Sequence, residues 1–153
     1  MHLRSRREER YVAAQDLLLR CAMLLGILWA LPLTLLGLLS GIPILLLRGR
    51  VYVITDSTPA LLIRGPIADY LLAHHPFGPM SAMAIGHVII AESHGLTKQI
   101  LTHELAHVRQ ASVWGALFPV AYLAASLWAW SRGQDAYWNN RFEVAARNAE
   151  RHA

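Results

Sequence analysis

The chain alternates between long uncharged stretches and shorter polar segments. The longest such stretch, residues 21–47, contains no Asp, Glu, Lys, Arg or His. A helix crosses a bilayer with about 20 apolar residues, and two crossings would need about 40. The stretch therefore predicts one retained transmembrane anchor, which Pro32 can kink. Residues 1–20 ahead of it are expected to form a basic, largely helical lead-in.

Shorter runs after the anchor predict β-strands. Residues 51–55 and 60–64 are rich in apolar and β-branched side chains and flank the turn residues Asp56–Pro59, which together favour a hairpin. Residues 82–91 predict a third strand. Residues 69–80, which contain two prolines, are expected as a loop. We therefore expect a short three-stranded antiparallel sheet.

The last third of the chain predicts helices. Thr97 suits an N-cap, and apolar residues recur at helical spacing from residue 100 to residue 108. A second uncharged stretch, residues 111–131, is interpreted as an apolar backing helix, and residues 135–152 as a final helix. The fold class predicted is thus α+β, with a small domain over residues 48–153 behind an anchor over residues 21–47.

Composition and charge support a membrane location. Hydrophobic residues make up 55% of the chain and charged residues only 16%, against a usual charged share of about a quarter. Basic residues cluster ahead of the anchor, which favours a cytoplasmic N-terminus and an extracytoplasmic domain. An anchor that re-enters at Pro32 would instead leave the domain in the cytoplasm. Acidic residues interrupt the basic cluster and no nucleic-acid motif follows, so a nucleic-acid partner is not expected. The clustered residues are Arg4, Arg6, Arg7, Arg10 and Arg20.

The pentapeptide His103-Glu104-Leu105-Ala106-His107 has the spacing of a zinc-binding helix. Residues four apart lie one turn apart on nearly the same face, so two imidazoles can share one tetrahedral ion. Glu104 reaches the edge of that face, where it can act on water without binding the metal. Cys21 is the only cysteine, which excludes both an intramolecular disulfide and a cysteine-based zinc site.

A catalytic zinc site usually has a third protein ligand. At 1.5 Å per residue, a helix that turns back near residue 114 and again near residue 133 would return Glu143 to the level of the two histidines. Glu143 is therefore the favoured third ligand. If residues 111–131 instead crossed the bilayer, Glu143 and His103 would lie on opposite sides and the motif would be accidental. The other candidates are His74, His75, His87, His94 and Glu92.

The two histidines with a downstream helical glutamate resemble the gluzincin metallopeptidases, in their smallest form. The resemblance implies zinc held by His103, His107 and Glu143, Glu104 as general base, and an edge strand within residues 82–91 that pairs with a peptide substrate. Many gluzincins place an acidic residue four positions after the ligand glutamate, where this chain has Arg147. A closer resemblance is to a family of small uncharacterised bacterial membrane proteins, and rests on His103-Glu104-x-x-His107-Val108-Arg109-Gln110, Trp114-Gly115-x-Leu117-Phe118, Ala121-Tyr122-Leu123 and Tyr137-x-x-Asn140-x-Phe142-Glu143-x-x-Ala146.

The function predicted is a membrane-anchored zinc metalloprotease that hydrolyses peptide bonds, with Glu104 taking a proton from zinc-activated water. Tyr137 and His87 are suggested as donors to the developing oxyanion, and Asn139 or Asn140 as residues that orient a ligand or cap the final helix. The alternative is a non-catalytic membrane protein whose zinc is structural and which binds a partner. The sequence does not specify the substrate or the oligomeric state.

Overall fold

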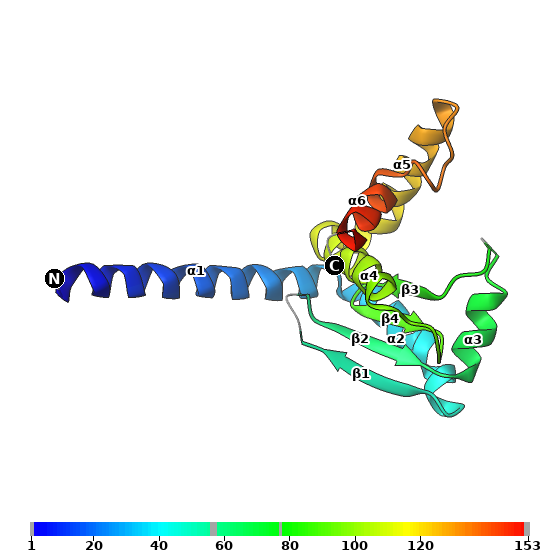
Figure 1. Ribbon diagram of the computed structural model, residues 1–153, viewed down its shortest axis with the longest axis horizontal. Coiled ribbons are helices and arrows are strands. Elements are labelled where there is room, and N and C mark those ends of the chain that lie inside the picture. Colours follow the sequence, from blue (N-terminus) through cyan, green and yellow to red (C-terminus); the bar gives the residue numbers. More distant parts are fainter. Residues whose placement is uncertain (1, 56–57, 77, 152–153) are drawn as a thin grey trace.

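The computed structural model describes residues 2–55, 58–76 and 78–151. It contains a four-stranded mixed sheet with helices on both faces, so the predicted α+β class is confirmed. The helix α1 (His2–Trp29) projects away from this body (Figure 1). Strand order in the sheet is β1-β2-β4-β3.

The predicted three-stranded antiparallel sheet is wrong in strand number and direction. Strands β1 (Arg50–Ile54) and β2 (Ala60–Arg64) form the predicted antiparallel hairpin, although Asp56 and Ser57 of its turn lie outside the described residues. The run 82–91 forms two antiparallel strands, β3 (Ala82–Ile85) and β4 (Val88–Ala91). The turn between them needs the positive φ of 60° that Gly86 adopts. β4 then pairs in parallel with β2.

The predicted loop over residues 69–80 is also partly wrong, because α3 (Pro66–Ala73) covers its first residues. Pro66 occupies the first turn, where its missing N–H costs no hydrogen bond. Ala68 and Leu72 are buried on one face of α3. The chain between β2 and β3 thus adds a helix to the core.

The predicted single anchor is divided near Pro32 into α1 and α2 (Leu31–Leu46). A proline in the first turn of α2 cannot continue the hydrogen bonding of α1. The helix α2 packs on the sheet, with Leu33 and Ile44 buried. Gly37 permits this approach, since a Cβ there would lie 2.6 Å from the Ile85 carbonyl oxygen. The second half of the predicted anchor is therefore part of the folded body.

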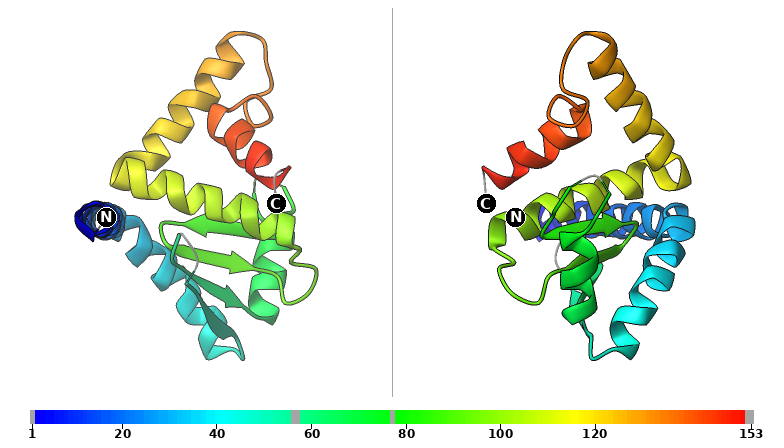
Figure 2. Two further views of the ribbon diagram at one scale, coloured as in Figure 1. Left: turned by 60° about the vertical axis from the view of Figure 1, so that its left-hand side comes forward. Right: turned by 90° about the vertical axis from the view of Figure 1, so that its right-hand side faces the viewer.

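Within the described residues, two segments are by length and composition apolar enough to cross a membrane: Glu8–Trp29 and Lys98–Ser131. The first is the straight, largely exposed part of α1, about 33 Å long at 1.5 Å per residue. The second consists of α4 (Lys98–Trp114), the 3₁₀ turn η1 (Gly115–Leu117) and α5 (Phe118–Ser131). The chain changes direction at η1 (Figure 2), so α5 alone is about 21 Å long, shorter than the roughly 30 Å apolar core of a bilayer.

The core forms on both faces of the sheet. Ile63 and Val88 pack with Ile44 and Leu72 from α2 and α3, whereas Ile89 packs on the other face with residues of α4. Successive residues of a strand point to opposite faces, so β2 and β4 supply both layers. The α4 helix begins as predicted at Thr97, whose side chain accepts a hydrogen bond from the Ile100 N–H at 3.2 Å.

The final helix, α6 (Arg141–Glu150), begins later than predicted. Asp135 holds the preceding turn by accepting hydrogen bonds from the backbone N–H groups of Tyr137 and Trp138. Asn140 caps α6, accepting from the Phe142 N–H at 2.9 Å. Figure 2 shows α5 rising away from α4 and α6 returning toward it, and α6 packs against α4.

Candidate metal centre

His103 and His107 lie one turn apart on α4 and face the same side. Their Nε2 atoms are 3.0 Å apart, and their rings are arranged edge to face, with centroids 4.7 Å apart. Only 13% and 11% of the two side chains is exposed. Because α4 packs on the sheet through its opposite face, both imidazoles are directed toward the returning α6.

Glu143, in the first turn of α6, completes the group. Its Oε2 atom lies 3.4 Å from His103 Nε2, and its Oε1 atom lies 3.3 Å from His107 Nε2. Four per cent of its side chain is exposed. The structure thus brings together the three residues that the sequence predicted, and does so through packing of α6 on α4.

The donor atoms lie close enough together to share one ion. Two ligands about 2.05 Å from a zinc ion in tetrahedral geometry lie roughly 3.3 Å apart. The two imidazole Nε2 atoms are 3.0 Å apart, and each lies 3.3–3.4 Å from a different oxygen of the Glu143 carboxylate. One donor atom from each of the three residues lies within 4.8 Å of the other two. Glu143 Oε2 is buried and has no hydrogen-bond partner among the described residues, which is costly unless a cation compensates it. His103, His107 and Glu143 together could therefore hold a metal ion.

The outer nitrogen of each imidazole is occupied by a side chain. His103 Nδ1 contacts Glu150 Oε1, and His107 Nδ1 donates to Gln110 Oε1 at 2.8 Å. A proton held on Nδ1 leaves the Nε2 lone pair directed at the shared centre. Two such lone pairs 3.0 Å apart would repel one another without a cation between them.

Glu150 is a residue that sequence reasoning missed. The expected position for an acidic partner was residue 147, where Arg147 instead lies 3.8 Å from Glu143 Oε2 and stacks on Trp138 with its Cζ 4.3 Å from the ring centroid. Glu150 lies seven residues after Glu143, two turns along the same face of α6. The seven-residue spacing from Glu143 was the signal in the sequence that could have identified Glu150. It allows a carboxylate to reach His103 although position 147, four residues after Glu143, is an arginine.

Gln110 and Tyr122 belong to the residue pattern that carries the family resemblance, without a role assigned from the sequence. Gln110 also donates through Nε2 to the Phe142 carbonyl at 3.0 Å, so it ties α4 to α6 beside His107. The Tyr122 hydroxyl, from α5, donates to Glu143 Oε1 at 2.7 Å. Gln110, on α4, therefore positions His107 of the same helix, and Tyr122, on α5, positions Glu143 of α6.

Charge and burial act against each other at this centre. Burial alone would raise the pKa of Glu143, but its contacts with His103 and His107 outweigh burial and hold that pKa well below its usual range. Burial favours the neutral imidazoles, yet the Glu143 carboxylate raises the pKa of both His103 and His107. The site as it stands thus attracts positive charge.

Glu104 lies on the sheet side of α4 and is 6% exposed. Its carboxyl group accepts a hydrogen bond from the backbone of Ala84 in β3. Burial raises the pKa of Glu104, although the nearby His107 and His103 lower it in part. A carboxylate of raised pKa next to two imidazoles is suited to accept and return a proton.

The two suggested oxyanion donors differ in position. Tyr137 lies near Glu143, and burial together with that carboxylate raises the pKa of Tyr137 to about 12. His87 lies in the turn between β3 and β4, where Nδ1 donates to the Pro59 carbonyl at 2.6 Å and Nε2 is 3.0 Å from Ser112 Oγ. Both nitrogens of His87 therefore have partners within the fold, and its suggested role as an oxyanion donor stays a prediction.

The remaining candidates lie apart from the centre. His74, at the end of α3, stacks on Tyr70 with ring centroids 4.3 Å apart, and His94 lines a separate pocket beside Arg64. The side chain of Asn140 caps α6 through its Oδ1 atom, and its Nδ2 group donates to the Tyr122 carbonyl oxygen and to Ser126 Oγ. Among the described residues, the three-residue donor group consists of His103, His107 and Glu143.

The chain matches no protein-family model, no curated protein and no solved structure. The resemblance to gluzincins therefore rests on the residues of the site and on their spacing.

Proposed function

We propose that this chain is a membrane-anchored zinc metallopeptidase. The observation that carries the proposal is the convergence of His103, His107 and Glu143. The two imidazole Nε2 atoms are 3.0 Å apart, each lies 3.3–3.4 Å from an oxygen of the Glu143 carboxylate, and both histidine Nδ1 atoms contact other side chains. Two imidazoles and one carboxylate are a donor set typical of catalytic zinc sites, which leave a fourth position open.

The position of Glu104 supports a hydrolytic role. When bound, zinc would supply a Lewis acid that acidifies water and polarises a carbonyl group. Glu104 takes the proton of the attacking water and returns it to the leaving amine. Burial keeps the pKa of Glu104 raised, which makes its carboxylate a stronger base toward the proton of the attacking water.

The edge of the sheet offers a place for an extended peptide. Strand β3 is the last strand in the order β1-β2-β4-β3, and Ala84 within it contacts Glu104. A peptide that adds to a sheet edge gains backbone hydrogen bonds that do not depend on its sequence. A substrate paired with β3 would present its backbone carbonyl groups beside Glu104.

Zinc content and peptide hydrolysis together test the function. Purified full-length protein should contain one zinc per chain by elemental analysis, and Glu143→Ala should lose it. Glu104→Gln should keep the zinc and lose hydrolysis of a mixed fluorogenic peptide library. Glu9→Gln, at an exposed position of α1, is the matched control and should keep both. Zinc-free wild-type protein would refute the metal site, and zinc without hydrolysis would favour the structural-zinc alternative.

The proposed topology places the N-terminus in the cytoplasm and the domain outside. Apolar side chains cover the outside of α1 between residues 17 and 28, with Leu18, Leu25 and Leu28 each more than 60% exposed. Such a surface suits lipid rather than water. Alkaline phosphatase fused after the last residue should be active in bacterial cells if the domain is outside, and a fused green fluorescent protein should then be dark. The reverse pattern would place the domain in the cytoplasm.

A further inference from the structure

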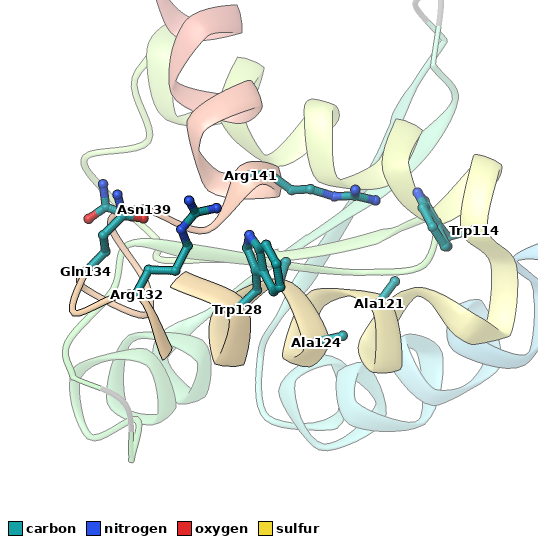
Figure 3. A pocket seen from close by; sticks show the side chains of 9 residues that line it. Trp114, Ala121, Ala124, Trp128, Arg132, Gln134, Asn139 and Arg141 are labelled. Atoms are coloured by element: carbon teal, nitrogen blue, oxygen red, sulfur yellow. The ribbon is translucent and has the colours of Figure 1, made fainter. Parts of the chain in front are cut away.

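A second pocket lies between α5 and the start of α6, with a cavity volume of about 680 Å³. Trp114 and Arg141 line one side of it, and Trp128 and Arg132 line another (Figure 3). None of these four residues belongs to the candidate metal centre. The pocket is large enough for a small amphiphilic molecule.

Both arginines are held against aromatic rings. The Cζ atom of Arg132 lies 5.3 Å from the centroid of Trp128, and that of Arg141 lies 5.4 Å from Trp114. Stacking of this kind restrains the guanidinium plane and leaves its N–H edge free to bind an anion. Figure 3 shows both guanidinium groups in the space between α5 and α6.

The pocket carries positive charge that the described residues do not neutralise. No Asp or Glu lines it, and among the described residues neither Arg132 nor Arg141 forms a salt bridge. Asp135, the acid nearest to Arg132 along the chain, accepts hydrogen bonds from the backbone N–H groups of Tyr137 and Trp138, and Glu143, the acid nearest to Arg141, lies against His103 and His107. Two guanidinium groups can bind one phosphate through paired N–H donors.

The floor of the pocket is apolar. Three alanines of α5 form it, at positions 121, 124 and 125. The outer side of α5 is apolar too: Val120 and Leu127 are 66% and 55% exposed, and Trp130 is 69% exposed. Tryptophan and arginine at the end of an exposed apolar helix are typical of the membrane–water interface. The floor therefore continues into a surface that suits acyl chains.

We propose that this pocket binds the phosphate headgroup of an anionic phospholipid, with Arg132 and Arg141 on the phosphate and the acyl chains along α5. Charge complementarity and the continuous apolar surface favour a lipid over a free phosphate, which would use only the arginines. Basic pockets between helices near a membrane surface are known to hold lipid headgroups.

The test titrates three probes into full-length protein in a neutral maltoside detergent and follows tryptophan fluorescence. The probes are dioctanoyl phosphatidylglycerol, dioctanoylglycerol and inorganic phosphate. We expect phosphatidylglycerol to bind at least tenfold more tightly than either of the others. Arg132→Gln/Arg141→Gln should weaken that binding at least tenfold. The control Arg109→Gln/Arg151→Gln, which removes the same charge at exposed positions, should change it less than twofold.

A second pair of variants keeps both arginines. Ala124→Glu places a carboxylate on the floor and should weaken phosphatidylglycerol binding at least fivefold, whereas Ala145→Glu, at an exposed position of α6, should not. Equal affinities within either variant–control pair would overturn the proposal. So would binding of dioctanoylglycerol or inorganic phosphate as tight as that of phosphatidylglycerol. Zinc content is measured on the same samples, so a failed metal site is recognised separately.

Discussion

Glu150 contacts the Nδ1 atom of His103 across the interface between α6 and α4. Its position two turns beyond Glu143 means that one face of α6 supplies both a donor to the shared centre and a carboxylate that orients a second donor. Glu150 thus supplies, within α6, an acidic partner for His103 that the resemblance to gluzincins placed at position 147, where this chain has Arg147. Partners of this kind hold a histidine ring in place and raise its basicity.

Glu150→Gln should weaken zinc binding without abolishing it. The amide still reaches His103 Nδ1 but carries no charge, and loss of such an outer partner costs about 10–100-fold in metal affinity. Competition with a chromogenic zinc chelator measures the change. Glu9→Gln removes the same charge from α1 and should leave the affinity within twofold. An unchanged affinity in Glu150→Gln would show that the contact does not orient the ligand.

Tyr122→Phe should loosen the α5–α6 packing at Glu143. The hydroxyl donates to a buried carboxylate at 2.7 Å, and a hydrogen bond to a charged group contributes about 1.5–3 kcal/mol. We expect a lower melting temperature of the full-length protein in detergent and a zinc affinity reduced by about tenfold.

Tyr70→Phe is the control for Tyr122→Phe. Tyr70 is 62% exposed on α3, so loss of its hydroxyl should affect neither the melting temperature nor the zinc affinity. If the two variants behave alike, the Tyr122 hydroxyl contributes nothing specific to Glu143.

The pH dependence of stability should reverse when zinc is added. Glu143 raises the folded-state pKa of His103 and His107 above the unfolded value of about 6.5. In zinc-free protein the two histidines therefore add to folding stability. This stabilisation is fully present below their unfolded-state pKa and is lost as the pH rises through their folded-state pKa. The pKa of Glu143 is lowered in the folded protein. Its stabilisation is therefore present at neutral pH and is lost in acid, as the pH falls through the folded-state pKa of Glu143.

Zinc binding requires neutral imidazoles and therefore favours higher pH. Thermal unfolding of zinc-free protein should show lower stability at pH 8.5 than at pH 6, about two units above and just below the histidine reference value. With excess zinc, the stabilisation by the metal should be larger at pH 8.5. His107→Gln should reduce both effects. Equal pH profiles with and without zinc would contradict an imidazole site.

Gly37→Ala and Gly41→Ala should differ in sign. Alanine is favoured over glycine within a helix by about 1 kcal/mol. At Gly37 a Cβ would lie 2.6 Å from the Ile85 carbonyl oxygen and 2.8 Å from Val88 Cβ, atoms that cannot move aside. At Gly41 it would meet Ile63 Cδ1, the end of a flexible side chain.

We therefore expect Gly37→Ala to destabilise the protein by about 1–3 kcal/mol, and Gly41→Ala to be neutral or slightly stabilising. Chemical denaturation of the full-length protein in detergent, followed by circular dichroism, compares the two. Equal destabilisation by both would show that α2 does not lie as closely on the sheet at Gly37 as described.

Local patterns in the sequence determined the elements around the site. The Thr97 cap, the helix that carries His103 and His107, and the hairpin of β1 and β2 follow from spacing and turn chemistry that neighbouring residues set among themselves. The return of Glu143 toward the histidines could also be predicted, because helix rise converts residue number into length. The bounds of these elements were less accurate, as the late start of α6 at Arg141 shows.

Only the tertiary structure decided how distant segments meet. An uncharged stretch has the same composition whether lipid or a sheet covers it, so residues 31–46 read as membrane anchor although Gly37 and Ile44 pack on strands. An apolar run of ten residues likewise does not reveal whether it forms one strand or the hairpin of β3 and β4. The contact of Glu150 with His103 depends on the rotation of α6 against α4. Spacing within a helix determines which residues share a face, whereas packing between helices determines what that face touches.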